Sequence, residues 1–146
     1  MPRICEVSHT VTAQADPKAV WDLICAPCSI LDWNPRIVNC DSRTNAQGQI
    51  VRDYVLHPGG DGAPTMVETE LLRSDAIMTI TYMVEMVGLP ITDYVAQILV
   101  TPNDAGGCSV EIRSRFVDLE VGVDTSELVL GFYTIGLETL AGRVAA

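Results

Sequence analysis

The chain has 146 residues, of which 48% are hydrophobic and 19% are charged, and this is the length and composition of one globular domain. Nine lysine and arginine residues stand against 19 aspartate and glutamate residues, which gives a formal net charge of -10. A surface this acidic offers no cationic path for phosphate groups. Nucleic acids and anionic membrane surfaces are therefore excluded as partners.

The N-terminal residues contain no apolar stretch ahead of a cleavage site, and no apolar run in the chain is long enough to span a bilayer. The sequence therefore predicts neither export nor stable membrane insertion. We expect a cytoplasmic protein.

The five cysteines are an odd number and lie in apolar stretches, a pattern typical of buried, reduced thiols rather than of a disulfide framework. Cys25 and Cys28 have the CxxC spacing of a redox pair, but the strand and βαβ context of thioredoxin are missing around them. The chain has no second CxxC, and His9 and His57 are far apart in the sequence. We therefore predict no metal site.

The first third of the chain predicts one strand followed by two short helices. Residues 4–14 alternate in polarity and are rich in β-branched side chains, as in a strand. Asp16 can cap a helix whose first turn accepts Pro17, and Pro27 ends that helix. A second short helix is predicted over residues 29–33, before the turn signal Asn-Pro.

The middle of the chain predicts an antiparallel meander, and the end predicts one long helix. Six strand-like runs are separated by segments rich in Gly, Pro, Asn and Asp, which favour tight turns. These runs are residues 36–43, 48–57, 64–73, 77–87, 92–102 and 108–118. A cap cluster at 124–126 then precedes an apolar pattern that predicts a helix nearly to the end. One sheet with its helices on one face is α+β architecture, and we place residues 1–146 in a single domain.

Six short segments, in this order and spacing, resemble a known superfamily. They are ADPKAVWDL at 15–23, LDWNP at 31–35, GQIVR at 48–52, VETELL at 67–72, ITY at 80–82 and GLETL at 136–140. Together they are similar to the START/Bet v 1-like (SRPBCC) superfamily, which includes polyketide cyclases, dehydrases and lipid-transport proteins. The resemblance covers almost the whole chain. It implies the helix-grip fold, in which a curved seven-stranded antiparallel sheet surrounds a long C-terminal helix, with two short helices after the first strand.

The resemblance also implies a mostly apolar cavity between the sheet and the terminal helix. The layout of residues 48–94 is similar to that of plant abscisic-acid receptors, with 57–62 at their gate loop and 89–91 at their latch. Asn34 stands where those receptors have a ligand-pairing lysine, so the resemblance implies a shared pocket layout and not hormone recognition. Carried over residue by residue, the implied lining is Trp33, Asn34, Tyr54, Leu56, Glu68, Tyr82, Val84, Tyr94, Leu128, Phe132 and Gly136. Gly136 would leave room for a ligand where a larger residue would fill it.

Alternation along the strands leaves the direction of several charged side chains open. Arg52 faces the cavity if the resemblance holds, or extends to the rim with its aliphatic stem packed. Glu68 and Glu70 share one face of their strand, which is either the cavity face or the solvent face. A carboxylate facing the cavity would have its pKa raised by burial, as a general acid or base near neutrality requires.

The last strand presents a conflict between two patterns. Hydrophobicity predicts that Val110, Ile112 and Phe116 face the core, which sends Arg113 and Arg115 into solvent. The receptor-like alignment instead points both arginines inward, where they would neutralise a buried glutamate or bind an anionic group of a ligand. An Arg–Glu pair in the cavity is predicted in the second case.

The leading functional hypothesis is a protein that binds a small hydrophobic or aromatic ligand, polyketide-like or lipid-like, in an internal cavity. In its enzymatic form it would resemble a polyketide cyclase or dehydratase, with Glu68, Arg113 and Tyr82 as catalytic residues and no cofactor. Arg52 and Arg115 join the cavity lining as ligand-binding residues. The alternatives are a non-catalytic carrier or sensor of a lipid or hydrophobic metabolite, and an interaction module whose interior holds no ligand. The sequence is also compatible with a homodimer.

Overall fold

The computed structural model describes residues 1–145, and its elements follow the predicted order. Strand β1 (Arg3–Ala13) precedes helices α1 (Pro17–Cys25) and α2 (Ile30–Trp33). The next strands are β2 (Ile37–Thr44), β3 (Ile50–Leu56), β4 (Thr65–Ser74), β5 (Thr79–Val87), β6 (Ile91–Pro102) and β7 (Cys108–Asp118). Helix α3 (Thr125–Ala145) follows them.

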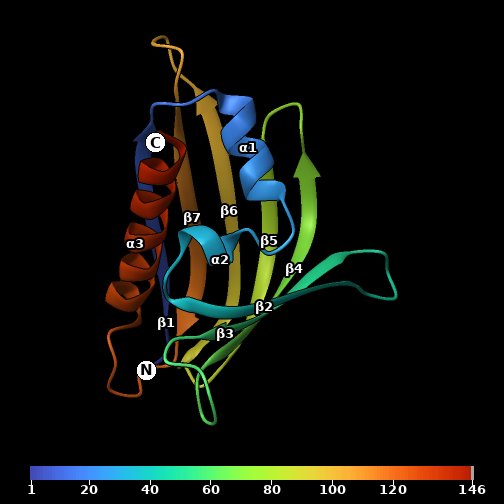
Figure 1. Ribbon diagram of the computed structural model, residues 1–146. Helices are drawn as coiled ribbons and strands as arrows, with labels where there is room; N and C mark the ends of the chain where they lie inside the picture. Colours follow the sequence, from blue (N-terminus) through green and yellow to red (C-terminus); the bar gives the residue numbers. More distant parts are fainter. Residues whose placement is uncertain (146) are drawn as a thin grey trace.

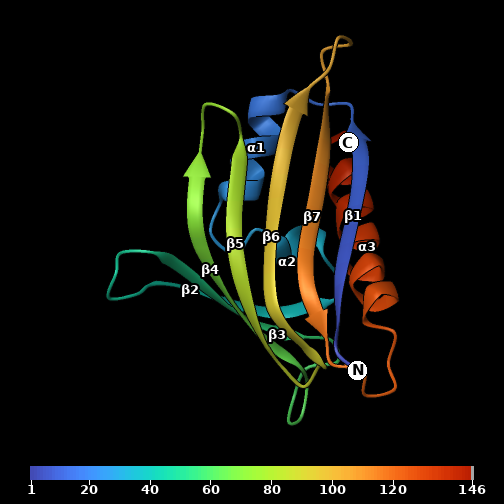
Figure 2. The same ribbon diagram turned by 180° about the vertical axis from the view of Figure 1, so that it is seen from behind.

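The seven strands form one antiparallel sheet in the order β1-β7-β6-β5-β4-β3-β2. The sheet bends so strongly that β2 and β3 run across the lower end of the other strands at a steep angle (Figure 1). All three helices lie on the concave side, and the view from behind shows the strands in front of them (Figure 2). The predicted α+β helix-grip fold is therefore confirmed.

Helix α1 is positioned by its cap and by one buried indole. The side chain of Asp16 accepts a hydrogen bond from the N–H of Ala19 at 3.1 Å, and Pro17 occupies the first turn. Trp21 is almost fully buried, and its Nε1 donates to Oδ1 of Asp75 at 2.9 Å. This bond joins the helix to the turn between β4 and β5.

Strand β4 contains a bulge that determines which of its charged residues meet. Its pairing with β5 shifts register between Glu70 and Leu72. In a regular strand, residues three positions apart point to opposite faces. The extra residue at the bulge brings Arg73 to the same side as Glu70.

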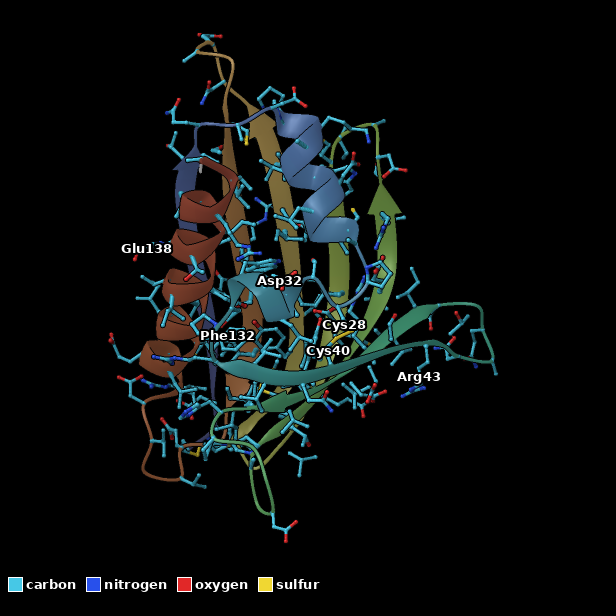
Figure 3. The ribbon with its side chains drawn as sticks, viewed as in Figure 1. Cys28, Asp32, Cys40, Arg43, Phe132 and Glu138 are labelled. Atoms are coloured by element: carbon cyan, nitrogen blue, oxygen red, sulfur yellow. A yellow bond between two sulfur atoms is a disulfide. The ribbon has the colours of Figure 1, made fainter. Side chains whose placement is uncertain are left out.

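A disulfide between Cys28 and Cys40 contradicts the expectation of reduced cysteines. The two residues are 12 positions apart, and their Cα atoms lie 5.6 Å from each other because the loop before α2 lies over β2. Figure 3 shows this bond between the two labelled cysteines. Cys25 is free, so the CxxC spacing forms no pair here. The prediction of a cytoplasmic protein loses the support that it drew from the cysteines and stays a prediction.

None of the helices in the described residues is both long enough and apolar enough to cross a membrane.

Breaking the disulfide is expected to destabilise the fold. A cross-link that closes a loop of this length stabilises a domain by about 2–4 kcal/mol. Replacing Cys40 by Ser should therefore lower the free energy of unfolding by about that amount, as should a phosphine reductant added to the wild type. Urea unfolding followed by tryptophan fluorescence measures both effects. Cys25→Ser is the matched control, and it should keep the response to reductant. Equal stability of the oxidised and reduced wild type would contradict this expectation.

Candidate functional site

A cavity lies between the concave face of the sheet and the two helices α2 and α3. It contains about 1020 Å³ of space free of protein atoms, its open mouth included. Figure 3 shows Phe132 of α3 on the side of that helix that faces α2, while Glu138 lies on the opposite side.

The structure places twelve of the fourteen residues predicted for the site in the cavity wall. They are Trp33, Asn34, Arg52, Tyr54, Leu56, Glu68, Tyr82, Val84, Tyr94, Leu128, Phe132 and Gly136. Their roles in binding or catalysis stay predictions.

Sequence reasoning missed much of the apolar wall and one tyrosine. Besides Leu89 and Ile91 of the expected latch, the wall includes Met66, Met86, Ile112, Val129 and Tyr133. Tyr133 is buried, and its hydroxyl has no hydrogen-bond partner within residues 1–145. The spacing from Val129 to Tyr133, Gly136 and Leu137 on α3 is the signal that could have placed it on the buried face.

A buried ion pair forms the polar part of the cavity wall. Nη1 of Arg52 donates to Oε2 of Glu68 at 3.0 Å, and the hydroxyl of Tyr54 donates to the same oxygen at 3.0 Å. The side chains of Arg52 and Glu68 are only 7% and 13% exposed. The two residues meet because they are directly opposite each other in the pairing of β3 with β4. Both hydrogen bonds end on Oε2, which leaves Oε1 of Glu68 available to a ligand.

A second carboxylate and a second arginine extend this pair toward the surface. Nη1 of Arg52 lies 2.8 Å from Oε2 of Glu70. Arg73 donates to both oxygens of Glu70, from Nε at 2.9 Å and from Nη2 at 2.7 Å. Period-two reasoning could not pair Glu70 with Arg73, because it places them on opposite faces and the bulge is not visible in the sequence. We refer to Arg52, Glu68, Glu70 and Arg73 as the charge cluster.

The two carboxylates of the charge cluster have pKa values shifted in opposite directions. Burial raises the pKa of Glu68, although the charge of Arg52 and the hydrogen bond from Tyr54 oppose this effect. Burial also acts to raise the pKa of Glu70, but the hydrogen bonds from Arg73 and the charge of Arg52 outweigh it and lower that pKa below its ordinary value. Glu68 is therefore the carboxylate that takes up a proton more readily.

Tyrosine hydroxyls provide further polar groups in a mostly apolar wall. Burial, and after it the charge of Glu68, raises the pKa of Tyr54 well above its ordinary value. Burial also raises the pKa of Tyr82 and of Tyr94. All three phenols are neutral near pH 7, and Tyr82 and Tyr94, whose hydroxyl protons are not given to Glu68 as that of Tyr54 is, can donate hydrogen bonds to an oxygen of a ligand.

The prediction that Arg113 and Arg115 reach the cavity is wrong. Arg113 is 54% exposed on the outer face of the sheet, where its Nε and Nη2 donate to Oε1 of Gln97 at 3.0 and 2.7 Å. Arg115 is also exposed. Residues of β7 alternate, and the inward positions are occupied by the buried Ile112 and Phe116. Hydrophobicity therefore decided the direction of this strand, and the predicted Arg–Glu pair is made by Arg52.

The absence of a side chain at Gly136 makes room for Asn34 and Trp33, and not only for a ligand. A Cβ atom at this position would lie 2.6 Å from Nδ2 of Asn34 and 3.4 Å from Cζ3 of Trp33. Asn34 is buried, and its Nδ2 donates to the carbonyl oxygen of Phe132 at 3.4 Å. The glycine thus permits α2 to pack closely on α3.

The segment at the expected latch lines the cavity, and the one at the expected gate does not. Leu89 and Ile91, before and at the start of β6, belong to the wall. None of residues 57–62, all of which the structure describes, does so, and His57 is exposed.

A bent sheet that holds a long helix over a lined cavity defines the START/Bet v 1-like class of proteins. Residues 5–145 match the family described as polyketide cyclase / dehydrase and lipid transport. This match covers nearly all of the 146 residues, and the protein belongs to that family. A search of curated proteins finds no match.

Several solved structures of differently named proteins have the same fold. A protein of Bacillus thuringiensis described as uncharacterised has a TM-score of 0.82 at 24% identity, over 97% of this chain and 100% of its own. The Zhui aromatase/cyclase of Streptomyces sp. R1128 has a TM-score of 0.73 at 16% identity, over 97% and 94%. Norcoclaurine synthase of Thalictrum flavum has a TM-score of 0.65 at 16% identity, over 98% of both chains. These likenesses show the fold.

Adding one methyl group at Gly136 is expected to disturb the contact between α2 and α3. Gly136→Ala forces Asn34 or the helix to move, which costs about 1–3 kcal/mol of unfolding free energy. Gly142→Ala, in the same helix, meets no atom within 4 Å, so it should be neutral or stabilising by up to about 1 kcal/mol. Thermal unfolding of the two variants measures the difference. A Gly136→Ala protein as stable as the Gly142→Ala protein would rule out the close contact.

The stability contributed by Glu70 is expected to depend on pH. Its pKa lies below the ordinary value of 4.5, so its ion pairs stabilise the folded state above that pH, and this stabilisation is lost as the pH falls through the lowered pKa. Glu70→Gln should therefore cost about 2–3 kcal/mol at pH 7 and clearly less at pH 4. Urea unfolding at both pH values measures the two costs. Asp53→Asn, which removes the exposed pair with Arg43, should cost less than about 1 kcal/mol. An equal cost of Glu70→Gln at both pH values would contradict the assignment.

Proposed function

We propose that this protein binds a small hydrophobic or aromatic ligand that carries a few oxygens, and that Glu68 transfers protons to and from this ligand. The observation that carries the proposal is a carboxylate with a raised pKa in the wall of a mostly apolar cavity, held by Arg52 and Tyr54. An apolar interior has no structural need for such a group, and burying a charge is costly unless it is paired. The family and the aromatase/cyclase neighbour support this direction.

The chemistry that suits this arrangement is enolisation of a ketone. Oε1 of Glu68 takes a proton from the carbon next to the carbonyl, and the electron pair of that C–H bond moves to form the enolate. The enolate oxygen accepts a hydrogen bond from the hydroxyl of Tyr82 or Tyr94, which stabilises the new negative charge. The enolate carbon can then attack a second carbonyl, as in cyclisation, and the proton on Glu68 passes to the alkoxide oxygen that forms. In dehydration, the proton on Glu68 leaves with a hydroxyl group as water.

The raised pKa of Glu68 fits this role because a general base works best when its pKa approaches the working pH. The apolar wall would contribute by holding a flexible chain in a reactive conformation. Each step moves only protons and electron pairs of the substrate, so the proposal includes no cofactor.

A non-catalytic carrier is the second candidate, and the apolar character of the rest of the wall favours it. Met66, Met86 and Leu89 are adaptable or apolar side chains that suit a hydrophobic guest. A carrier would bind an enolisable ketone without exchanging its protons, and this difference separates the two candidates.

Proton exchange of a bicyclic ketone tests the catalytic proposal. We expect the protein to accelerate the exchange of the α-hydrogens of 2-tetralone in D₂O, followed by proton NMR. Glu68→Gln should lower the protein-dependent rate by about 100-fold or more, because the amide cannot act as the base. Glu85→Gln, an identical change on the neighbouring strand β5 at an exposed position, should keep the wild-type rate. Exchange that is equally fast with Glu68→Gln would refute the role of Glu68, and binding without exchange by the wild type would favour the carrier.

A further inference from the structure

We propose that the cavity selects ligands that are neutral where they meet Glu68 and rejects carboxylates of the same shape. The proposal rests on the ligand-binding part of the proposed function and is independent of its catalytic part. It names the class of ligand as one with a hydroxyl, enol, ketone or amide group on an apolar skeleton. Fatty acids and other carboxylate ligands fall outside this class.

The charge balance of the charge cluster is the first reason. Arg52 lies 3.0 Å from a carboxylate oxygen of Glu68 and 2.8 Å from one of Glu70, and Arg73 pairs with Glu70 as well. Two positive and two negative groups sum to zero. The positive charge of Arg52 is therefore already neutralised, and none is left over for an anionic ligand.

The composition of the wall is the second reason. Among the described residues that line the cavity, Arg52 is the only arginine or lysine and Glu68 is the only aspartate or glutamate. A ligand carboxylate near Arg52 would also stand near Glu68. Like charges repel strongly where water is excluded, so either the ligand or Glu68 would have to take up a proton.

A ligand carboxylate would not bind more favourably by displacing Glu68 from Arg52. A ligand that took over the bond to Arg52 would leave Glu68 buried without its cation, and an unpaired buried charge is costly. The net charge of -10 on the whole chain acts in the same direction, because it disfavours the approach of anions to the protein.

A neutral polar group of a ligand has suitable hydrogen-bond partners at the same position, next to Glu68. Oε1 of Glu68 can accept a hydrogen bond from a hydroxyl, an enol or an amide N–H. The hydroxyls of Tyr82 and Tyr94 can donate to a carbonyl oxygen of the ligand. These phenols stay neutral at pH 8, because burial raises their pKa values.

The test compares two probes that share size and shape and differ in charge. The probes are 2-naphthamide, which is neutral, and 2-naphthoate, which is ionised at pH 8. Isothermal titration of the purified full chain at pH 8 measures both dissociation constants. We expect the wild type to bind the amide at least tenfold more tightly than the carboxylate.

One variant should reverse the selection. Glu68→Gln removes one negative charge, so the cluster gains a net positive charge and Arg52 is no longer neutralised from the cavity side. The affinity for 2-naphthoate should then rise at least tenfold, while that for 2-naphthamide should not rise, because its N–H loses a charged acceptor. Glu85→Gln changes the net charge of the chain by the same amount on the outer face, and it should keep the wild-type ratio.

The outcomes separate this inference from the proposed catalysis. Equal binding of the two probes by the wild type, or tighter binding of the carboxylate, overturns the inference even if 2-tetralone exchanges its protons. A preference for the amide without any exchange supports the inference and refutes catalysis. If neither probe binds the wild type, both proposals fall. If Glu68→Gln does not fold in urea-unfolding controls, the wild-type ratio alone decides the inference.

Discussion

The buried guanidinium of Arg52 is the constraint on which the site depends. Removing this charge from water costs several kcal/mol unless carboxylates surround it, and Glu68 and Glu70 do so from the neighbouring strand. The contacts of Arg52 with these two carboxylates require the observed register of β3 with β4, which places Arg52 opposite Glu68. It also requires the bulge after Glu70, which brings Arg73 to the same side. Backbone pairing, the bulge and the charges therefore form one unit, in which the loss of any charged member leaves the cluster with a net charge.

Because the sheet is curved, the charge cluster lies away from the part of the core where α3 packs on the sheet. Helix α3 covers the β1 end of the sheet, whereas β3 and β4 lie toward the other end (Figures 1 and 2). The close contact of Gly136 with Asn34 holds α2 against α3. The disulfide from Cys28 to Cys40 ties the loop before α2 to β2. The cavity remains between these fixed elements, and its lining is mostly apolar, with Arg52, Glu68, Asn34 and the tyrosines among its polar side chains.

The same neutralised cluster accounts for both functional proposals. Burial within it gives Glu68 a raised pKa, which is suited to exchanging protons with a bound ketone. The cluster also leaves Arg52 without free charge, which is unsuited to binding an anion. A polyketide-like skeleton with hydroxyl and ketone groups meets both conditions, and a fatty acid meets neither.

The sequence by itself determined the order of the elements and the long final helix, because caps and turn residues are local properties of the chain, whereas it left the direction of β7 open. The resemblance added the fold and most of the cavity wall, Glu68 included. Only the tertiary structure decided that Arg52, and not Arg113, pairs with Glu68, that Arg73 joins Glu70, and that Cys28 finds Cys40. These pairings are set by the strand register, by a single bulge and by the bend of the sheet. All three features depend on contacts between residues that are distant along the chain.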